Sequence, residues 1–273
     1  MDKSNIRKPA VAGQFYPATA ISIQKQIDAF LPEPARKKDV IGCMLPHAGY
    51  MYSGLVAART VARIVVKDTV VLLGPNHTGL GAAFSLMAAG IWQTPMGEVG
   101  IDEALSRDIL AGSDYLENDD LAHAREHSLE VELPILQYFR KDFKIVPIAF
   151  GSDDFAALTD IGLAVARAVK AGKRQPSTLL AASSDMTHYE PAKAARAKDD
   201  AAIKAVLDLD ARALWETVRT RNITMCGYMP VIAMITAARE LGATKGELVH
   251  YATSGDVTGD NSSVVGYAGI IIY

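Results

Sequence analysis

The chain has 273 residues, of which 49% are hydrophobic and 22% are charged, and its formal net charge is −3. This composition predicts a globular protein with a large core, and the small charge gives no bulk case for binding nucleic acid or an anionic membrane. The first ten residues lack the apolar run of a secretory signal, and the most apolar stretch, 264–273, is too short to cross a bilayer. Two cysteines, Cys43 and Cys226, make no disulfide framework, so we expect a reducing, cytoplasmic location.

Apolar runs of strand length alternate with longer segments of helical period. In chain order they predict a helix at 20–31, a strand at 40–45, a helix at 54–66, strands at 69–73 and 83–87, helices at 102–111 and 128–139, a strand at 144–150, a helix at 154–170, a strand at 178–182, helices at 191–207, 211–218 and 230–241, and strands at 247–252 and 264–272. Continuous apolar runs are typical of strands buried on both faces. We therefore expect an α/β fold, a single domain over 1–273 with a central, largely parallel or mixed sheet flanked by helices.

The N-terminal stretch RKPAVAGQFYP at 7–17 is too aromatic for a loose tail. We expect Phe15 and Tyr16 to dock on the body of the protein. The residues alone favour a structural strap over a wall of an active site.

Three of the six histidines directly follow apolar runs. His47 follows 41–45, His77 follows 70–73, and His188 follows 179–182. Ligands bind at the carboxyl ends of the strands in open α/β sheets, so the pattern predicts metal binding or acid–base chemistry at one sheet edge.

Neutral imidazoles suit first-row metals, and a catalytic site needs a third protein ligand, for which carboxylates and a thiolate are candidates. Cys226 lies in a turn before an apolar helix, whereas Cys43 lies inside a strand and is expected to be inert packing. Two imidazoles and a thiolate would favour copper, iron or zinc over magnesium or calcium.

Asp185 and His188 are three residues apart, and would share one face if their segment is helical. His188 is a candidate general acid or base. Asp185 can orient an imidazole, bind metal, or simply cap a helix.

The segment EHSLEVELP at 126–134 is expected to open a helix, with Ser128 as its cap and glutamates offsetting the helix dipole. That interpretation explains the glutamates but not His127, which would lie where the start of the helix meets the pocket. His123 lies in a polar loop, and His250 lies in an alternating strand where we expect it to be packed or solvated.

Six motifs together resemble the Memo family, whose prokaryotic members are named AmmeMemoRadiSam system protein B. They are RKPAVAGQFYP at 7–17, PHAGY at 46–50, GPNH at 74–77, EHSLEVELP at 126–134, SSDMTHY at 183–189 and CGYMP at 226–230. The similarity runs from about residue 7 to the C-terminus and implies a fold similar to class III extradiol dioxygenases, which use non-haem iron(II).

The resemblance also implies roles for individual residues. The metal ligands would be His47, His77 and Cys226, with His188 as the acid–base histidine, Asp185 in the same pocket and His127 in contact with substrate. Cysteine takes the place of the dioxygenases' glutamate, and a thiolate would favour copper(I) or shift the potential of iron. The expected cofactor is one iron(II) or copper ion per chain, with zinc possible.

Three functions remain open at this level. The first is a redox or dioxygenase-like oxidoreductase, and the second is a binding module that keeps the fold and pocket for a peptide or small ligand without turnover. The third is a metal-dependent hydrolase, since GPNHTG resembles a metallophosphoesterase segment, although the chain lacks the clustered Asp-x-His element. The family resemblance adds an AMMECR1-domain protein and a radical SAM enzyme as partners, with no nucleic acid and no membrane.

Overall fold

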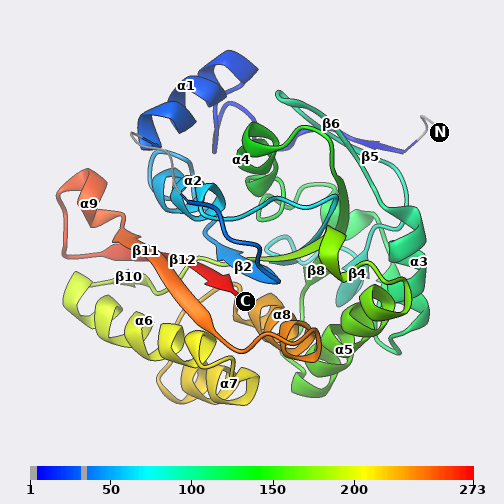
Figure 1. Ribbon diagram of the computed structural model, residues 1–273. Helices are drawn as coiled ribbons and strands as arrows, with labels where there is room; N and C mark the ends of the chain where they lie inside the picture. The colour runs from blue at the N-terminus through cyan, green and yellow to red at the C-terminus, as the bar shows by residue number, and fades with distance from the viewer. Residues whose placement is uncertain (1–4, 32–35) are drawn as a thin grey trace.

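The computed structural model describes residues 5–31 and 36–273, and a mixed β-sheet with helices on both faces forms its centre (Figure 1). In pairing order the strands are β10 (His188–Glu190), β12 (Val264–Ile272), β2 (Gly42–Leu45), β9 (Thr178–Ser183), β3 (Thr69–Pro75), β8 (Lys144–Phe150), β4 (Phe84–Leu86) and β7 (Glu117–Asn118), and β11 (Gly246–Thr253) also pairs with β12. Strands β2, β9, β3 and β8 are parallel, whereas β12 and β4 run antiparallel to them. The predicted α/β fold with a mixed sheet is thus confirmed.

A small second sheet and the helices complete the described chain. The small sheet contains β1 (Ile6–Arg7), β5 (Ile91–Thr94) and β6 (Gly97–Gly100). The helices are α1 (Ala20–Phe30), α2 (Gly54–Ala62), α3 (Glu103–Ala111), α4 (Glu132–Phe139), α5 (Phe155–Ala171), α6 (Ala192–Leu207), α7 (Ala211–Thr220), α8 (Tyr228–Glu240) and α9 (Gly255–Thr258).

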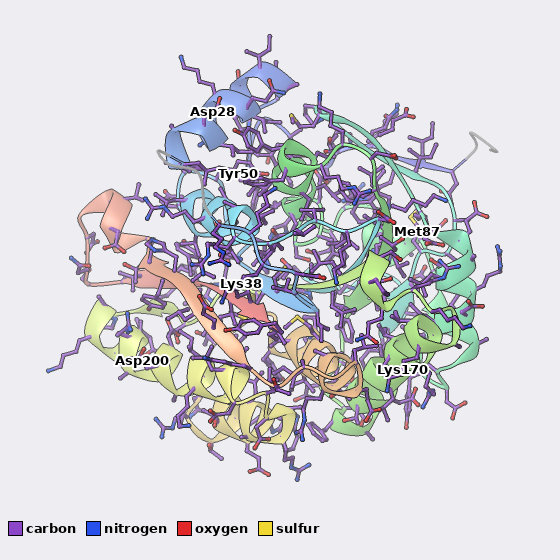
Figure 2. All side chains as sticks on the ribbon, in the orientation of Figure 1. Asp28, Lys38, Tyr50, Met87, Lys170 and Asp200 are labelled. Atoms are coloured by element: carbon purple, nitrogen blue, oxygen red, sulfur yellow. The ribbon has the colours of Figure 1, made fainter. Side chains whose placement is uncertain are left out.

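The central strands bury both faces, which explains their unbroken apolar runs. In β3, Val71 and Leu73 pack into the core under α3 and α5 to α8, while Val70 and Leu72 pack into the core under α1, α2 and α4. Tyr50 lies in this second core, whereas Lys170 and Asp200 lie on the outer surfaces of α5 and α6 (Figure 2).

Most predicted elements occur within a few residues of their expected bounds, but the helix predicted at 128–139 begins only at Glu132. Pro134 explains the difference, because proline is tolerated in the first turn of a helix and breaks a helix interior. The short strands β1, β5, β6, β7 and β10 were not predicted.

The carboxyl ends of β2, β3 and β9 meet at one edge of the sheet because these strands are parallel neighbours. The apolar stretch 264–273 supplies β12, which lies inside the sheet beside β2. Within residues 5–31 and 36–273, no helix combines the length and apolarity needed to cross a membrane.

Candidate metal centre

Two histidines and a cysteine from three separate parts of the chain converge at this edge. His47 follows β2, His77 follows β3, and Cys226 precedes α8. One donor atom from each lies within 4.8 Å of the others, and Cys226 Sγ is 3.3 Å from His47 Nε2. The predicted convergence of these three side chains is therefore present in the fold.

These three side chains can converge because the backbone is packed very closely at two glycines. A Cβ on Gly227 would lie 2.2 Å from the Ser183 carbonyl oxygen, so a side chain there would push Cys226 away from the end of β9. A Cβ on Gly74 would lie 2.5 Å from Leu129, and would separate β3 from the segment that follows His127. Glycine at both positions lets these loops pack directly on the strand ends.

His47 is 2% exposed, and both of its ring nitrogens have polar neighbours. Its Nδ1 lies 2.7 Å from Ser183 Oγ, which leaves Nε2 facing Cys226. Burial, followed by the nearby His77 and His127, lowers the pKa of His47 well below its usual range. The ring is therefore neutral at physiological pH, as a metal ligand must be.

His77 is held by Glu126, a residue to which the sequence interpretation gave only a dipole role. Glu126 accepts from the backbone N–H of His77 and lies 2.9 Å from His77 Nδ1, so Nε2 of that ring is left free. Although burial acts in the opposite direction, the bonds from His77 and from the Ser128 backbone lower the pKa of Glu126 to about 2. In metal sites, a histidine that binds the ion through one ring nitrogen commonly donates the N–H of the other to a carboxylate.

Ser128 does not cap a helix, contrary to the sequence interpretation. Its hydroxyl donates to the Pro75 carbonyl at the end of β3, and the residue preceding α4 is Val131. The segment before α4 is instead tied to the strand ends, which brings His127 to the site. His127 stacks on His77 with ring centroids 4.6 Å apart and packs against Phe15 at the same distance.

A cavity of about 560 Å³ opens beside these groups. Its lining is Phe15, His47, Ala48, Gly49, Tyr52, His77, His127, Asp185, His188, Tyr189, Thr224, Cys226, Val265 and Tyr267. Phe15 thus forms a wall of the cavity, so the N-terminal stretch is more than a structural strap. Tyr50, at the end of the PHAGY motif, does not line the cavity; it is buried and donates its hydroxyl proton to the Val131 carbonyl.

The segment that carries Asp185 and His188 is not helical, so the two do not share a helix face. Asp185 caps no helix; its Oδ1 accepts from the backbone N–H groups of His47 and Ala48 and fixes the turn after β2. Burial raises the pKa of Asp185 to about 6. His188 begins β10, and its Nδ1 lies 2.8 Å from the Thr224 carbonyl oxygen.

The two remaining histidines lie away from the cavity. His123 is fully buried in a short 3₁₀ turn and not in a solvated polar loop, and burial lowers its pKa to about 4. His250 is partly buried in β11, as expected for a packed or solvated residue.

Comparison with known proteins identifies the family. A family model described as Memo-like protein matches residues 7–271. The chain belongs to the Memo family. It is 47% identical to a "MEMO1 family protein" of Methanococcoides burtonii and 44% identical to one of Methanosarcina barkeri, each over 98% of this chain and 100% of the relative. A crystal structure of an uncharacterized protein from Escherichia coli K12 matches 84% of this chain and 98% of its own, with a TM-score of 0.56 and 13% identity, which shows a shared fold.

The donor set of this Memo-family chain fits a first-row metal. Two donors on one tetrahedral ion, a nitrogen at about 2.0 Å and a sulfur at about 2.3 Å, lie roughly 3.5 Å apart, close to the His47–Cys226 separation. Burial raises the pKa of the Cys226 thiol, and a coordinated thiol is deprotonated outright, so only a cation would make it a thiolate here. His77, Glu126 and His127 also lie close enough to hold an ion, but Glu126 is already engaged by His77 and Ser128.

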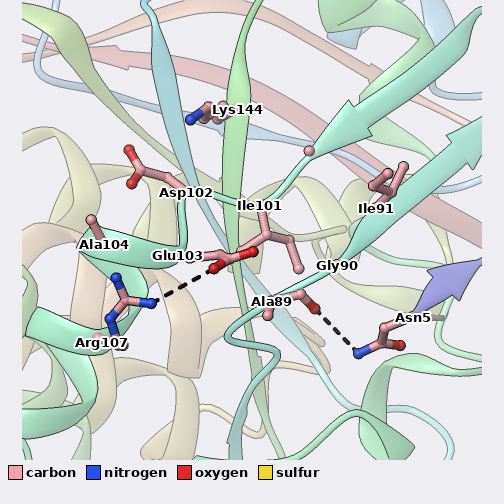
Figure 3. Close-up of a pocket in the computed structure, with 11 residues that line it drawn as sticks. Asn5, Ala89, Gly90, Ile91, Ile101, Asp102, Glu103, Ala104, Arg107 and Lys144 are labelled. Carbon is pink, nitrogen blue, oxygen red and sulfur yellow. Dashed lines mark hydrogen bonds and ion pairs between the residues drawn. The ribbon is translucent and has the colours of Figure 1, made fainter. Parts of the chain in front are cut away.

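A second cavity of the Memo-family chain, of about 490 Å³, lies beside the N-terminus of α3 (Figure 3). Glu103 and Arg107, one turn apart on α3, pair in its wall at 3.7 Å, and the Asn5 amide donates to the Ala89 carbonyl. The described residues that line this cavity include no histidine or cysteine, so the His47 site does not extend into it.

Proposed function

We propose that this Memo-family protein is a metal-dependent oxidoreductase that holds one iron(II) or copper ion through His47 Nε2, His77 Nε2 and Cys226 Sγ. The observation that carries the proposal is that one ligand atom of each of these three residues lies within 4.8 Å of the others, while Nδ1 of each imidazole is already engaged by a polar partner. Two nitrogens and a sulfur suit iron, copper or zinc, and the adjoining cavity leaves room for a ligand at an open position.

When bound, the ion would supply Lewis acidity and a redox couple to a ligand in the cavity. The protein itself supplies proton transfer. A carbonyl oxygen only accepts, so His188 Nδ1 donates to Thr224, and its Nε2 lone pair is left to take a proton from a bound ligand. His188 is therefore the proposed base, and it becomes the acid once protonated.

His127 and Asp185 complete the proposed chemistry. The His127 ring lies between Phe15 and His77 in the cavity wall, where it can bind an oxygen of the ligand. Asp185 keeps the turn that carries His47 in place and faces the same cavity. Because its carboxyl group faces the cavity, Asp185 can also exchange a proton with the ligand.

Metal content tests the proposal. Protein without an affinity tag is purified anaerobically, and iron and copper are measured in the wild type, His47→Ala and Cys226→Ala. We expect about one ion per chain in the wild type and less than a tenth of that in either variant. The matched controls are Cys43→Ala, which removes a buried cysteine inside β2, and His250→Ala, which removes a histidine of β11. Equal metal in all proteins, or none after reconstitution, would overturn the proposal.

A binding module without turnover is the second candidate function, favoured by Tyr189. This residue lines the cavity, is 78% exposed, and has a φ of 59°, a left-handed conformation that is costly for a bulky side chain. An exposed aromatic ring beside the cavity, held by a backbone in a costly conformation, suits ligand capture. Dioxygen consumption by the iron-loaded protein separates the candidates, because a binding module would hold iron and consume none.

A further inference from the structure

Two glutamates of one short segment lie behind the two histidines of the candidate centre. Glu126 contacts His77 Nδ1 directly, at 2.9 Å. Six residues later, Glu132 in the first turn of α4 contacts Ser183 Oγ, which in turn contacts His47 Nδ1. Each imidazole therefore has a polar partner on Nδ1. For His77 the partner is the carboxyl group of Glu126, and for His47 it is the hydroxyl of Ser183, which contacts the carboxyl group of Glu132.

The direction of the bonds around Ser183 follows from the proton count. A cation beside Cys226 could bind His47 only at Nε2, so the tautomer that binds it has the ring proton on Nδ1 and donates that proton to Ser183 Oγ over 2.7 Å. The hydroxyl then has one proton to give. Its two acceptors are the Ser128 carbonyl oxygen at 2.9 Å and Glu132 Oε1 at 3.1 Å.

Glu132 pairs with no cationic side chain in the part of the chain that the structure describes, so no ion pair explains a carboxyl group in this place. Its side chain is 1% exposed, and Oε2 has no hydrogen-bond partner among the described residues. Glu130, two residues earlier, is equally buried but is paired with Arg7 at 2.6 Å. A buried carboxyl group without such a partner costs stability, and costly polar groups of this kind collect at functional sites.

We propose that Glu132 is a positioning residue for His47 and acts through the Ser183 hydroxyl. By accepting a hydrogen bond from the Ser183 hydroxyl, Glu132 turns a lone pair of that oxygen toward His47 Nδ1–H, which favours the tautomer with a free Nε2. This inference rests on the proposed metal centre, because the tautomer matters only if Nε2 has a cation to bind. Outer partners of this kind typically change metal affinity by about 10–100-fold.

Cobalt(II) titration followed by visible absorption tests the chain of contacts. The protein is the full chain, and the variants are Ser183→Ala, Glu132→Leu and their combination. We expect each single variant to bind cobalt at least about tenfold more weakly than the wild type. The double variant should bind no more weakly than Ser183→Ala alone, because Glu132 acts only through that hydroxyl. Losses that multiply in the double variant would overturn the proposal, as would an unchanged affinity in Glu132→Leu.

Two further variants separate positioning from a merely structural effect. Glu132→Gln keeps an oxygen that accepts from Ser183, so we expect its cobalt affinity to return to within about threefold of the wild type. Ser106→Ala removes a buried hydroxyl that has no partner among the described residues, and it should leave the affinity unchanged.

Nitrogen-15 NMR of the metal-free proteins shows which ring nitrogen of His47 carries the proton. We expect one Nδ1–H tautomer in the wild type and a mixture in Ser183→Ala and Glu132→Leu. Failure of the wild type to bind cobalt would overturn the proposed function, whereas normal binding with a single His47 tautomer in both variants would overturn this inference alone.

Discussion

At the scale of single residues, the segment 123–132 brings four ionisable side chains into the interior for different reasons. Glu126 supports His77, Glu130 pairs with Arg7, Glu132 reaches Ser183, and His123 packs at the edge of the Trp92 ring. The burial of His123 should have a measurable effect on stability at mildly acidic pH.

The stability of the protein should depend on pH through His123. Burial, followed by the charge of Arg7, lowers its pKa from 6.5 to about 4 in the folded state. The unfolded chain therefore binds more protons between these values, and the free energy of unfolding falls as the pH is lowered through this window. From pH 7 to pH 5 the loss due to His123 is about 2 kcal/mol.

Urea unfolding at both pH values, in the wild type and in His123→Gln, measures this loss. The His123 ring Nε2 lies 3.3 Å from the Ser85 carbonyl, a contact that a glutamine amide can keep. Because the carboxyl groups titrate alike in both proteins, the difference between them isolates His123. An equal pH dependence in the two proteins would contradict the prediction.

Apolar runs that end in histidine predicted that His47 and His77 lie at one sheet edge, and the family resemblance added Cys226 as the third ligand. The partners that support these side chains were not predicted. The role of Glu126 was missed because a glutamate before a serine and an apolar run also matches the start of a helix. The hydrogen bond from the Ser128 hydroxyl to the Pro75 carbonyl, at the end of β3, distinguishes the observed loop from a helix start.

At the scale of elements, the N-terminal segment is held to the body by Arg7 in β1. Its guanidinium donates to the His123 and Glu126 carbonyls, pairs with Glu130, and lies 4.1 Å from the centre of the Trp92 ring. Glu130 also accepts from Tyr16, so one buried ion pair joins the segment containing Phe15 to the loop that carries His127.

Arg7→Met should destabilise the protein by about 3–5 kcal/mol, because the substitution leaves the Glu130 charge buried without its partner. Urea unfolding gives the free energy directly. The control is Arg107→Met, which breaks an exposed pair with Glu103 on α3 and should have little effect. Similar losses in both variants would show that the buried pair has no special role.

The elements that the sequence predicted best are those whose own residues determine them. Strand β8 matches its predicted bounds because its apolar run is buried on both faces. Strands β1 and β7 are two residues long and exist only through pairing with β5 and β4, so no local pattern marks them. The hairpin of β5 and β6 has four residues in each strand, too few for a clear period.

At the scale of the whole molecule, the candidate centre depends on the complete sheet. His47, His77 and Cys226 are far apart in the chain, and the parallel pairing of β2, β9 and β3 brings the first two to one edge. Cys226 arrives from the opposite end of the chain through the turn before α8. An unfolded chain does not keep these three donors together, so a metal ion should bind the folded state almost exclusively.

Metal binding should therefore stabilise the whole fold. A ligand that binds only the folded state adds about 2.7 kcal/mol to the free energy of unfolding when its free concentration is 100 times its dissociation constant. Zinc(II) is a suitable probe because it undergoes no redox change during the measurement. We expect urea unfolding of the wild type and Cys43→Ala to shift to higher denaturant with zinc, and that of Cys226→Ala to shift much less. A shift of equal size in Cys226→Ala would mean that zinc binds elsewhere, since Cys43 lies inside β2 and Cys226 is the cysteine that faces His47.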